Sequence, residues 1–220
     1  MQGFSRLITL TVALSASLYA GLLQAAPSVE LKVTGVIRPA ACTPTLAGSG
    51  VVDYGTIAAG ALQRGRSTAL PARQIGLTVA CNAAAKIAVT FVDNRAASRV
   101  DGILDQLRSG AEYNFGLGSV AGKNVGGYAL SFSSNATADA RSVSAIASKD
   151  RGNSWSQDAG FLDHANTYFS FAENGAASPV ALKVLSAQIN VQPVLNKAEE
   201  LPLTQDVPLD GSTTIEIKYL

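Results

Sequence analysis

In several segments of this chain, apolar and polar residues alternate with a period of two, which restricts the possible folds. In 214–219 the apolar positions are Ile215, Ile217 and Tyr219, and 29–34 alternates in the same way. Successive side chains of a strand point to opposite faces, so this period predicts half-buried β-strands. Further runs of strand character lie at 74–81, 87–91, 114–118, 127–132, 167–171 and 185–191. The chain is therefore predicted to be all-β.

Turn signals separate these runs. Asp101-Gly102, Asn174-Gly175 and Asp210-Gly211 are dipeptides typical of tight turns, because glycine tolerates a positive φ. Many short strands with frequent turns favour a β-sandwich over a parallel α/β sheet. The segment 98–109 is the exception, since its apolar residues follow helical spacing. It predicts one short helix or helical loop in the middle of the chain.

The first 25 residues have the order of a secretory signal peptide. A short, weakly basic start is followed by the uncharged apolar run 7–23 and by small residues at Ala25 and Ala26. The run falls short of a membrane span, so no span is expected after cleavage behind Ala25. The alternative is an uncleaved membrane tether. We expect a signal peptide at 1–25, a single sandwich domain at 26–220, and export to the periplasm, a fimbrium or the surface of a Gram-negative cell.

The chain has two cysteines, Cys42 and Cys81, and both lie in the part expected to be exported. An even pair in an oxidising compartment predicts one disulfide. A metal pair and a catalytic thiol are the alternatives, but no supporting ligands accompany either cysteine.

The balance of charge gives no sign of a nucleic-acid partner. Cleavage behind Ala25 takes Arg6 from the 17 basic residues, which leaves 16 basic and 16 acidic residues. A neutral chain lacks the basic footprint that nucleic acids or anionic membranes attract.

Four segments together resemble the subunits of chaperone–usher fimbriae. They are the run 33–37 leading to Cys42, the short segment 51–55, the run 75–81 that ends in Cys81, and the C-terminal strand 214–220 with its next-to-last aromatic residue. The middle, 100–166, departs from typical pilins. There, 115–118 and 126–130 look more like exported, fimbrial-like proteins whose domain carries only an unknown-function label.

The resemblance implies an immunoglobulin-like sandwich that lacks its last strand. In that family a periplasmic chaperone lends a strand, and the N-terminal extension of a neighbouring subunit later replaces it, so chaperone, usher and other subunits are the expected partners. The implied donor residues are Val29, Leu31 and Val33. The implied chaperone-facing strand carries Ile215, Ile217 and Tyr219. In the alternative interpretation, 29–33 is simply the first strand of a complete fold that does not polymerise.

Residues that could carry chemistry are sparse, and we expect no enzyme, no cofactor and no metal site. His164 is the only histidine; Asp163 lies beside it, but there is no Gly-x-Ser-x-Gly nucleophile motif. A single histidine without a carboxylate cluster does not form a usual zinc site. Asp93, Asp101 and Asp105 lack the spacing of a calcium loop and are interpreted as turn and surface residues.

Trp155 is the one candidate ligand platform. It is accompanied by Asn153, Gln157, Asp158 and His164, and an aromatic face flanked by amides suits a sugar. A carbohydrate- or surface-binding tip module is therefore an alternative function. The simpler interpretation is that Trp155 anchors a long loop to the sandwich.

Overall fold

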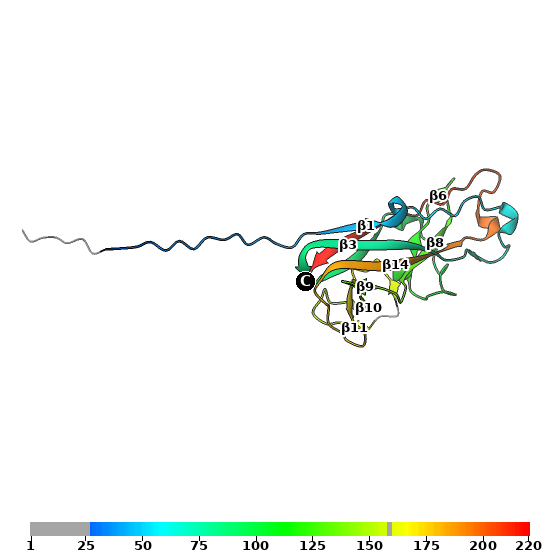
Figure 1. Ribbon diagram of the computed structural model, residues 1–220. Coiled ribbons are helices and arrows are strands. Elements are labelled where there is room, and N and C mark those ends of the chain that lie inside the picture. Colours follow the sequence, from blue (N-terminus) through cyan, green and yellow to red (C-terminus); the bar gives the residue numbers. More distant parts are fainter. Residues whose placement is uncertain (1–26, 158–159) are drawn as a thin grey trace, which may run out of the picture. The chain divides into compact units, whose positions relative to one another are not determined.

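The computed structural model describes residues 27–157 and 160–220, and its chain divides into two units, 1–38 and 39–220. The expected signal peptide, 1–25, lies outside the described residues. In the first unit, residues 27–38 form an extended segment without helix or strand (Figure 1), called here the N-terminal arm. Its side chains at Val29, Leu31 and Val33 are 97%, 88% and 91% exposed. The strand expected over 29–34 is therefore not formed within this chain.

The second unit, 39–220, is built from antiparallel strands. They are β1 (Cys42–Leu46), β2 (Thr68–Ala69), β3 (Arg73–Ala85), β4 (Ile87–Asp93), β5 (Phe115–Gly116), β6 (Ser119–Val120), β7 (Lys123–Asn124), β8 (Gly126–Phe132), β9 (Thr137–Ala138), β10 (Arg141–Ser148), β11 (Ser156–Gln157), β12 (Phe161–Leu162), β13 (Tyr168–Glu173), β14 (Leu182–Leu195) and β15 (Thr213–Tyr219). Short 3-10 turns lie at η1 (Ala47–Gly50), η2 (Ala59–Ala61), η3 (Ala96–Ser98), η4 (Ala111–Tyr113) and η5 (Ala198–Glu200).

The strands form two layers. One layer has the order β1-β3-β14-β8, with β2, β5 and β12 attached, and Figure 1 shows β1, β3 and β14 side by side. The other layer has the order β15-β4-β13-β10-β11. β9 pairs with both β14 and β10 and so joins the layers, while β6 and β7 form a separate ribbon. The predicted all-β sandwich is confirmed.

Aromatic side chains from both layers meet in the core. Phe91 of β4 lies 6.1 Å from Phe132 of β8 and 5.9 Å from Phe169 of β13, measured between ring centroids. Phe132 also contacts Phe171 at 5.1 Å, and all these pairs have edge-to-face geometry, which aromatic rings prefer over direct stacking. The inward-facing side chains of the alternating strands thus fill the space between the two sheets.

The segment 98–109 forms successive turns rather than an α-helix. The N–H of Ile103 bonds to the carbonyl of Val100, and the N–H of Arg108 bonds to that of Leu104. Gly102 has a φ of 67°, a left-handed conformation that interrupts an α-helix. Ile103 and Leu104 are nevertheless buried, so the apolar spacing reflects a packed turn. Of the two expected forms, the helical loop is the one present.

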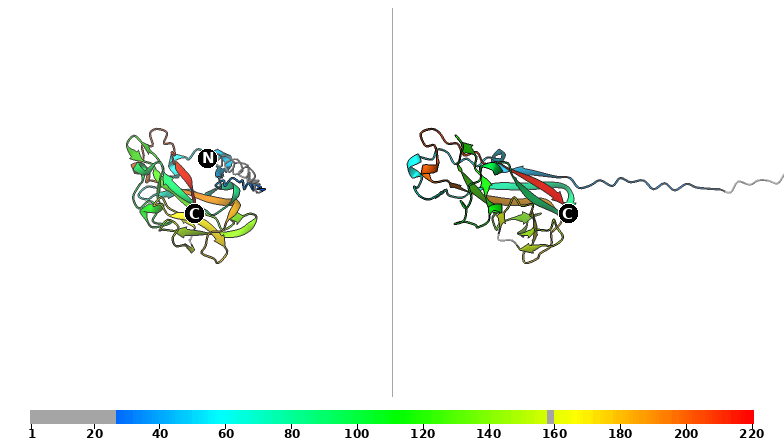
Figure 2. Two further views of the ribbon diagram at one scale, coloured as in Figure 1. Left: turned by 90° about the vertical axis from the view of Figure 1, so that its left-hand side faces the viewer. Right: turned by 180° about the vertical axis from the view of Figure 1, so that it is seen from behind.

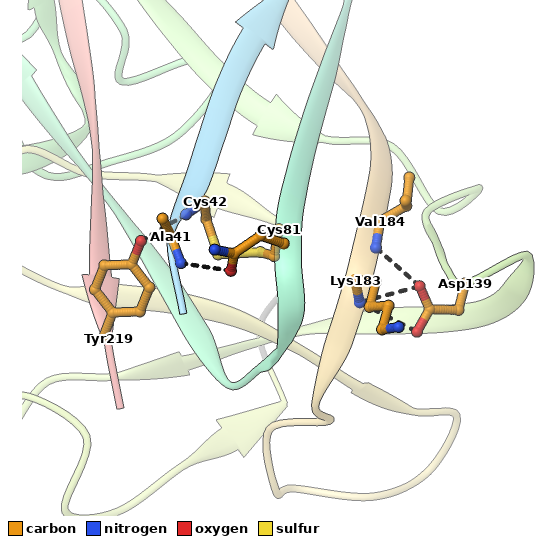
Figure 3. The surroundings of a disulfide bond; sticks show 8 residues. Ala41, Cys42, Cys81, Asp139, Lys183, Val184 and Tyr219 are labelled. Carbon is orange, nitrogen blue, oxygen red and sulfur yellow. Dashed lines mark hydrogen bonds between the residues drawn. A yellow bond between two sulfur atoms is a disulfide. The ribbon is translucent and has the colours of Figure 1, made fainter. Parts of the chain in front are cut away.

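The disulfide Cys42–Cys81 is present and joins β1 to β3 (Figure 3). The two residues are directly opposite in the antiparallel register, with 4.0 Å between their Cα atoms. The bond therefore fixes the first strand of the sandwich to β3, its one neighbour among the described strands. The disulfide excludes both alternatives for these cysteines.

Over the described residues, none of the helical segments has the length and apolar character needed to cross a bilayer.

Candidate functional site

Two edge strands face each other across the rim of the sandwich. Among the described strands, β1 pairs only with β3, and β15 pairs only with β4. Figure 2 shows β15, in red, beside the blue segment that includes β1. Each layer thus ends in a strand with one unpaired side, and unpaired strand edges are templates for another strand.

The free side of β15 carries the main-chain groups of its odd-numbered residues. The carbonyl of Ser212 accepts the N–H of Asn94, and the N–H of Leu220 donates to the carbonyl of Lys86. Even-numbered residues therefore bond to β4. In an antiparallel ladder the alternate residues point their N–H and C=O groups the other way. Those of Ile215 and Ile217 consequently point toward the gap.

The free side of β1 offers fewer donors. The 4.0 Å separation of Cys42 and Cys81 marks the closely spaced pair of an antiparallel ladder, which does not exchange hydrogen bonds. Cys42, Pro44 and Leu46 therefore direct their main-chain groups away from β3. Pro44 has no N–H to donate, and prolines within sheets usually lie on edge strands for this reason. An incoming strand would therefore find its richer set of hydrogen-bonding partners on β15.

An apolar groove lies between the two edges and is called the edge groove below. A cavity of about 180 Å³ is lined by Leu46 on the β1 side, by Ile215 on the β15 side, and by Ile75, Phe91 and Ile189 beneath. An adjoining cavity of about 410 Å³ shares Leu46 and Ile215 with it. A third, of about 840 Å³, continues past Tyr54, Val52 and Leu209 between the loops 51–62 and 201–209. The groove therefore has two walls, which are formed by residues 44–62 on one side and by residues 201–215 on the other.

The end of the groove at the disulfide is bridged by a hydrogen bond between the edges. The backbone N–H of Cys42 donates to the hydroxyl of Tyr219 at 2.7 Å. Figure 3 shows the Tyr219 ring reaching from β15 toward Ala41 and Cys42. Tyr219 itself is 53% exposed. The two walls are thus tied at this end by one side chain.

Two further tyrosines contribute to the walls of the groove. The Tyr128 hydroxyl lies 2.6 Å from the hydroxyl of Thr213, the first residue of β15, and burial raises the pKa of Tyr128 to about 12. The Tyr54 hydroxyl donates to the carbonyl of Val191 at 2.7 Å, and burial raises the pKa of Tyr54 as well. Both phenols are therefore neutral at physiological pH. They hold β15 and the loop 51–62 against the sandwich.

Asp93 is a buried aspartate whose burial the sequence pattern did not predict. It holds together the end of β4, opposite the first residue of β15. The Asp93 side chain is fully buried; it accepts bonds from the Arg99 guanidinium at 2.6 Å, the Arg95 N–H at 2.8 Å and the Gly116 N–H at 3.0 Å. Its interpretation as a turn and surface residue is therefore wrong. Arg95 and Arg99 are near Asp93 in sequence, but Gly116 is 23 residues away, and local patterning carries no signal for that third contact.

The loop leading into β15 is fixed by a second ion pair. The Arg95 guanidinium donates two bonds to the Asp210 carboxylate, at 2.9 and 3.0 Å. This contact lowers the pKa of Asp210 and raises that of Arg95. The Asp210 N–H also bonds to the carbonyl of Leu117. The middle of the chain thus positions the wall of the edge groove.

The residues expected from the sequence to act together lie in different units. Ile215, Ile217 and Tyr219 stand on the free edge of β15, with the two isoleucines partly buried against the core. Val29, Leu31 and Val33 belong to the exposed N-terminal arm.

The indole of Trp155 is engaged within its own loop. Its N–H donates to the carbonyl of Gly152 at 3.1 Å, and the side chain is half-buried. Asp158, one of its expected companions, lies outside the described residues. The interpretation as a loop anchor agrees with this arrangement, while the ligand-platform role stays a prediction.

His164 packs as a structural side chain. Its Nε2 lies 3.1 Å from the carbonyl of Ala111, and its ring meets Phe115 edge-on at 5.4 Å. The neighbouring Asp163 is buried and accepts the N–H of Ala165. Among the residues that the structure describes, no three His, Cys, Asp or Glu side chains gather as a metal site would require.

Comparison with known proteins places the chain in a family. The family model described as "Protein of unknown function (DUF1120)" matches residues 31–147, just over half of the chain. The "Uncharacterized protein YhcF" of Escherichia coli K12 is 28% identical over 90% of this chain and 92% of its own length. "Protein GltF" of the same organism is 27% identical over 94% of each. The chain therefore belongs to the DUF1120 family.

Proposed function

We propose that this protein is an exported assembly protein of the fimbrial-subunit type, whose edge groove takes up an extended strand from a chaperone or from a neighbouring subunit. The observation that carries the proposal is the edge groove itself. It is an apolar channel between two unpaired strand edges, with Leu46 and Ile215 on opposite walls.

The physical case rests on what an added strand would satisfy. Residues Ile215 and Ile217 carry main-chain groups that no described strand pairs with on the free side of β15, and apolar side chains line the groove beside Ile215. A strand inserted there would gain main-chain hydrogen bonds along the edge and would bury every second side chain in the channel. Such addition removes the liability of two exposed edges at once.

The N-terminal arm has the character of such a strand. Val29, Leu31 and Val33 are apolar and almost fully exposed, and they alternate with Glu30 and Lys32. Exposed large apolar side chains in a regular row mark a binding segment more often than isolated ones do. The arm can therefore serve as the strand that a neighbouring subunit takes up.

The experiment compares two arm variants of the protein produced without residues 1–25 and analysed on denaturing gels with and without boiling. Leu31→Asp places a charge on the apolar face of the arm and should abolish heat-sensitive multimers. Thr34→Asp places the same charge on the polar face and should retain them. Both positions are exposed in the structure, so folding is expected to be equal in circular dichroism.

A second experiment tests the edge groove. Coexpression with a periplasmic chaperone from a fimbrial operon should give a complex that is lost in Ile215→Thr/Ile217→Thr. Val92→Thr, on β4 but 41% exposed, is the matched control and should keep the complex. A monomer that unfolds cooperatively, forms no multimer and binds no chaperone would overturn the proposal in favour of a self-contained sandwich.

A further inference from the structure

We propose that the edge groove is filled by the N-terminal arm of a second copy of this chain, antiparallel to β15, in the one register that places Glu30 opposite Lys218 and Lys32 opposite Glu216. This inference rests on the proposed function and adds to it the partner and the alignment.

Two matching charge pairs suggest the alignment. On the arm, Lys32 Nζ lies 3.7 Å from Glu30 Oε2. On β15, Lys218 Nζ lies 2.7 Å from Glu216 Oε2. Each pair is spaced by two residues, so both of its members lie on one face of an extended chain. Along the sequence both pairs run acid then base, so antiparallel strands can set each acid opposite a base.

The apolar residues reduce the number of possible registers. Val29, Leu31 and Val33 must face the core, as Ile215 and Ile217 do, and directly opposite residues in an antiparallel pair share a face. Allowed registers therefore differ by steps of two residues. Placing Leu31 opposite Ile217 and Val33 opposite Ile215 satisfies the apolar requirement.

The charges distinguish this register from its neighbours. With Leu31 opposite Ile217, both cross-strand charge pairs are opposite in sign. A shift of two residues in one direction sets Glu30 against Glu216, and a shift in the other direction sets Lys32 against Lys218. Like charges directly opposite destabilise a strand pair, whereas opposite charges stabilise it by about 0.2–1 kcal/mol each.

The main-chain pattern of β15 agrees with the same register. Ile215 and Ile217 direct their N–H and C=O groups toward the groove, so they form hydrogen-bonded pairs with Val33 and Leu31. Glu216 and Lys218 then occupy the alternate positions, where opposite Cα atoms approach to about 4.5 Å and side chains are closest. The four charged groups thus lie where cross-strand pairing is strongest.

A parallel arm would lose this advantage. With Leu31 beside Ile217 in the parallel direction, Glu30 lies beside Glu216 and Lys32 beside Lys218. Parallel registers shifted by two residues keep at most one pair of opposite charges on these four side chains. The sequence therefore favours the antiparallel direction.

The antiparallel direction requires a second molecule. In this register Ile37 lies opposite Gly211, about 27 Å along the strand from Tyr219 at about 3.4 Å per residue. Cys42 of the same chain as the groove is hydrogen-bonded to Tyr219. The five steps from Ile37 to Cys42 reach at most about 18 Å. A chain therefore cannot place its own arm in its own groove in this way.

The test is cysteine cross-linking between two tagged copies of the protein produced without residues 1–25. One copy carries Thr34→Cys, and the other carries Thr214→Cys, the position opposite Thr34 in the proposed register. Mild oxidation should give a dimer that reductant dissolves. The matched control pairs Thr34→Cys with Ser212→Cys, two residues away, and should give at least tenfold less dimer.

A charge exchange tests the cause of the register. Glu30→Lys/Lys32→Glu in the arm should weaken assembly about tenfold, since two favourable pairs become unfavourable. The corresponding exchange Glu216→Lys/Lys218→Glu on the second copy should restore it. The effect should shrink as salt is raised, because exposed pairs are screened.

The outcomes separate this inference from the function on which it rests. Multimers that cross-link equally well through Ser212→Cys, or that ignore the charge exchange, would overturn the register while leaving strand uptake intact. The absence of multimers and of all cross-links, together with no chaperone complex, would overturn both. A chaperone complex without any cross-link between copies would show that a second copy of this chain is not the partner.

Discussion

The Tyr219 hydroxyl accepts a 2.7 Å hydrogen bond from the backbone N–H of Cys42 and so ties the two free edges of the sandwich together at one end. The bond joins the last strand to the first, and it sits beside the disulfide that holds β1 to β3. Because β1 and β15 each have only one strand neighbour among the described strands, this contact limits how far the edge groove can open at this end.

Removing this hydroxyl should loosen the β1 edge with little effect on global stability. Tyr219→Phe loses one partly exposed hydrogen bond, worth about 0.5–1 kcal/mol of unfolding free energy. Amide hydrogen exchange should show faster exchange at Cys42. Tyr168→Phe, on β13, is the control and should leave that amide unchanged. Equal exchange at Cys42 in wild type and Tyr219→Phe would show that the bond does not restrain the edge.

The disulfide should make the largest single covalent contribution to stability. It links residues 39 apart in sequence, and closing a loop of that length lowers the entropy of the unfolded chain. The double variant Cys42→Ala/Cys81→Ala should lose about 3–4 kcal/mol of unfolding free energy in urea titrations. Reduction of the wild-type protein should give a similar loss. A loss below about 1 kcal/mol would mean that β1 holds its place without the bond.

The two aspartate–arginine pairs near β15 should differ sharply in their contribution to stability. Asp93 is fully buried and serves three donors, so Asp93→Asn leaves the Arg99 charge poorly compensated and should cost about 3 kcal/mol. Asp210→Asn is the matched control: its pair with Arg95 is roughly half exposed and should cost less than about 1 kcal/mol. Chemical unfolding of both variants measures the difference. Equal losses would contradict the role given to burial.

The stability of the loop 148–154 should depend on pH through the ionisation of the Asp150 carboxylate. The hydroxyl of Ser148, then the hydroxyl and N–H of Ser154, donate to its carboxylate and lower its pKa from 3.8 to about 2. Because the pKa is lower in the folded state, the stabilisation is present above the unfolded pKa. It is lost as pH falls toward about 2.

A carboxylate titration followed by NMR tests this assignment. Ser148→Ala should raise the pKa of Asp150 toward its usual value. Ser156→Ala is the control, since its hydroxyl donates to the Ala147 carbonyl instead. An Asp150 that already titrates near 3.8 in the wild-type protein would refute the assignment.

Local patterning predicted most of the strands, because side-chain period is a property of the chain itself. The run at 74–81 became part of β3, with Leu77 and Val79 buried, and the C-terminal alternation became β15. For 98–109 the patterning left a short helix and a helical loop open, and the left-handed Gly102 accompanies the loop that is present. The patterning misjudged Asp93, whose buried carboxylate has one partner, Gly116, that is distant in sequence.

Residue type and spacing alone were enough to predict which segments are extended, that the two cysteines pair and which faces of the strands are apolar. The arrangement of the strands in space was needed to find that 29–34 does not join the sheets. It was also needed to find that β1 and β15 have free edges, among the described strands, on either side of an apolar groove. The physical reason is that an alternating segment has the same local pattern whether its partner strand is present or missing. The pairing order of distant strands, which no local pattern encodes, settles which edges stay open.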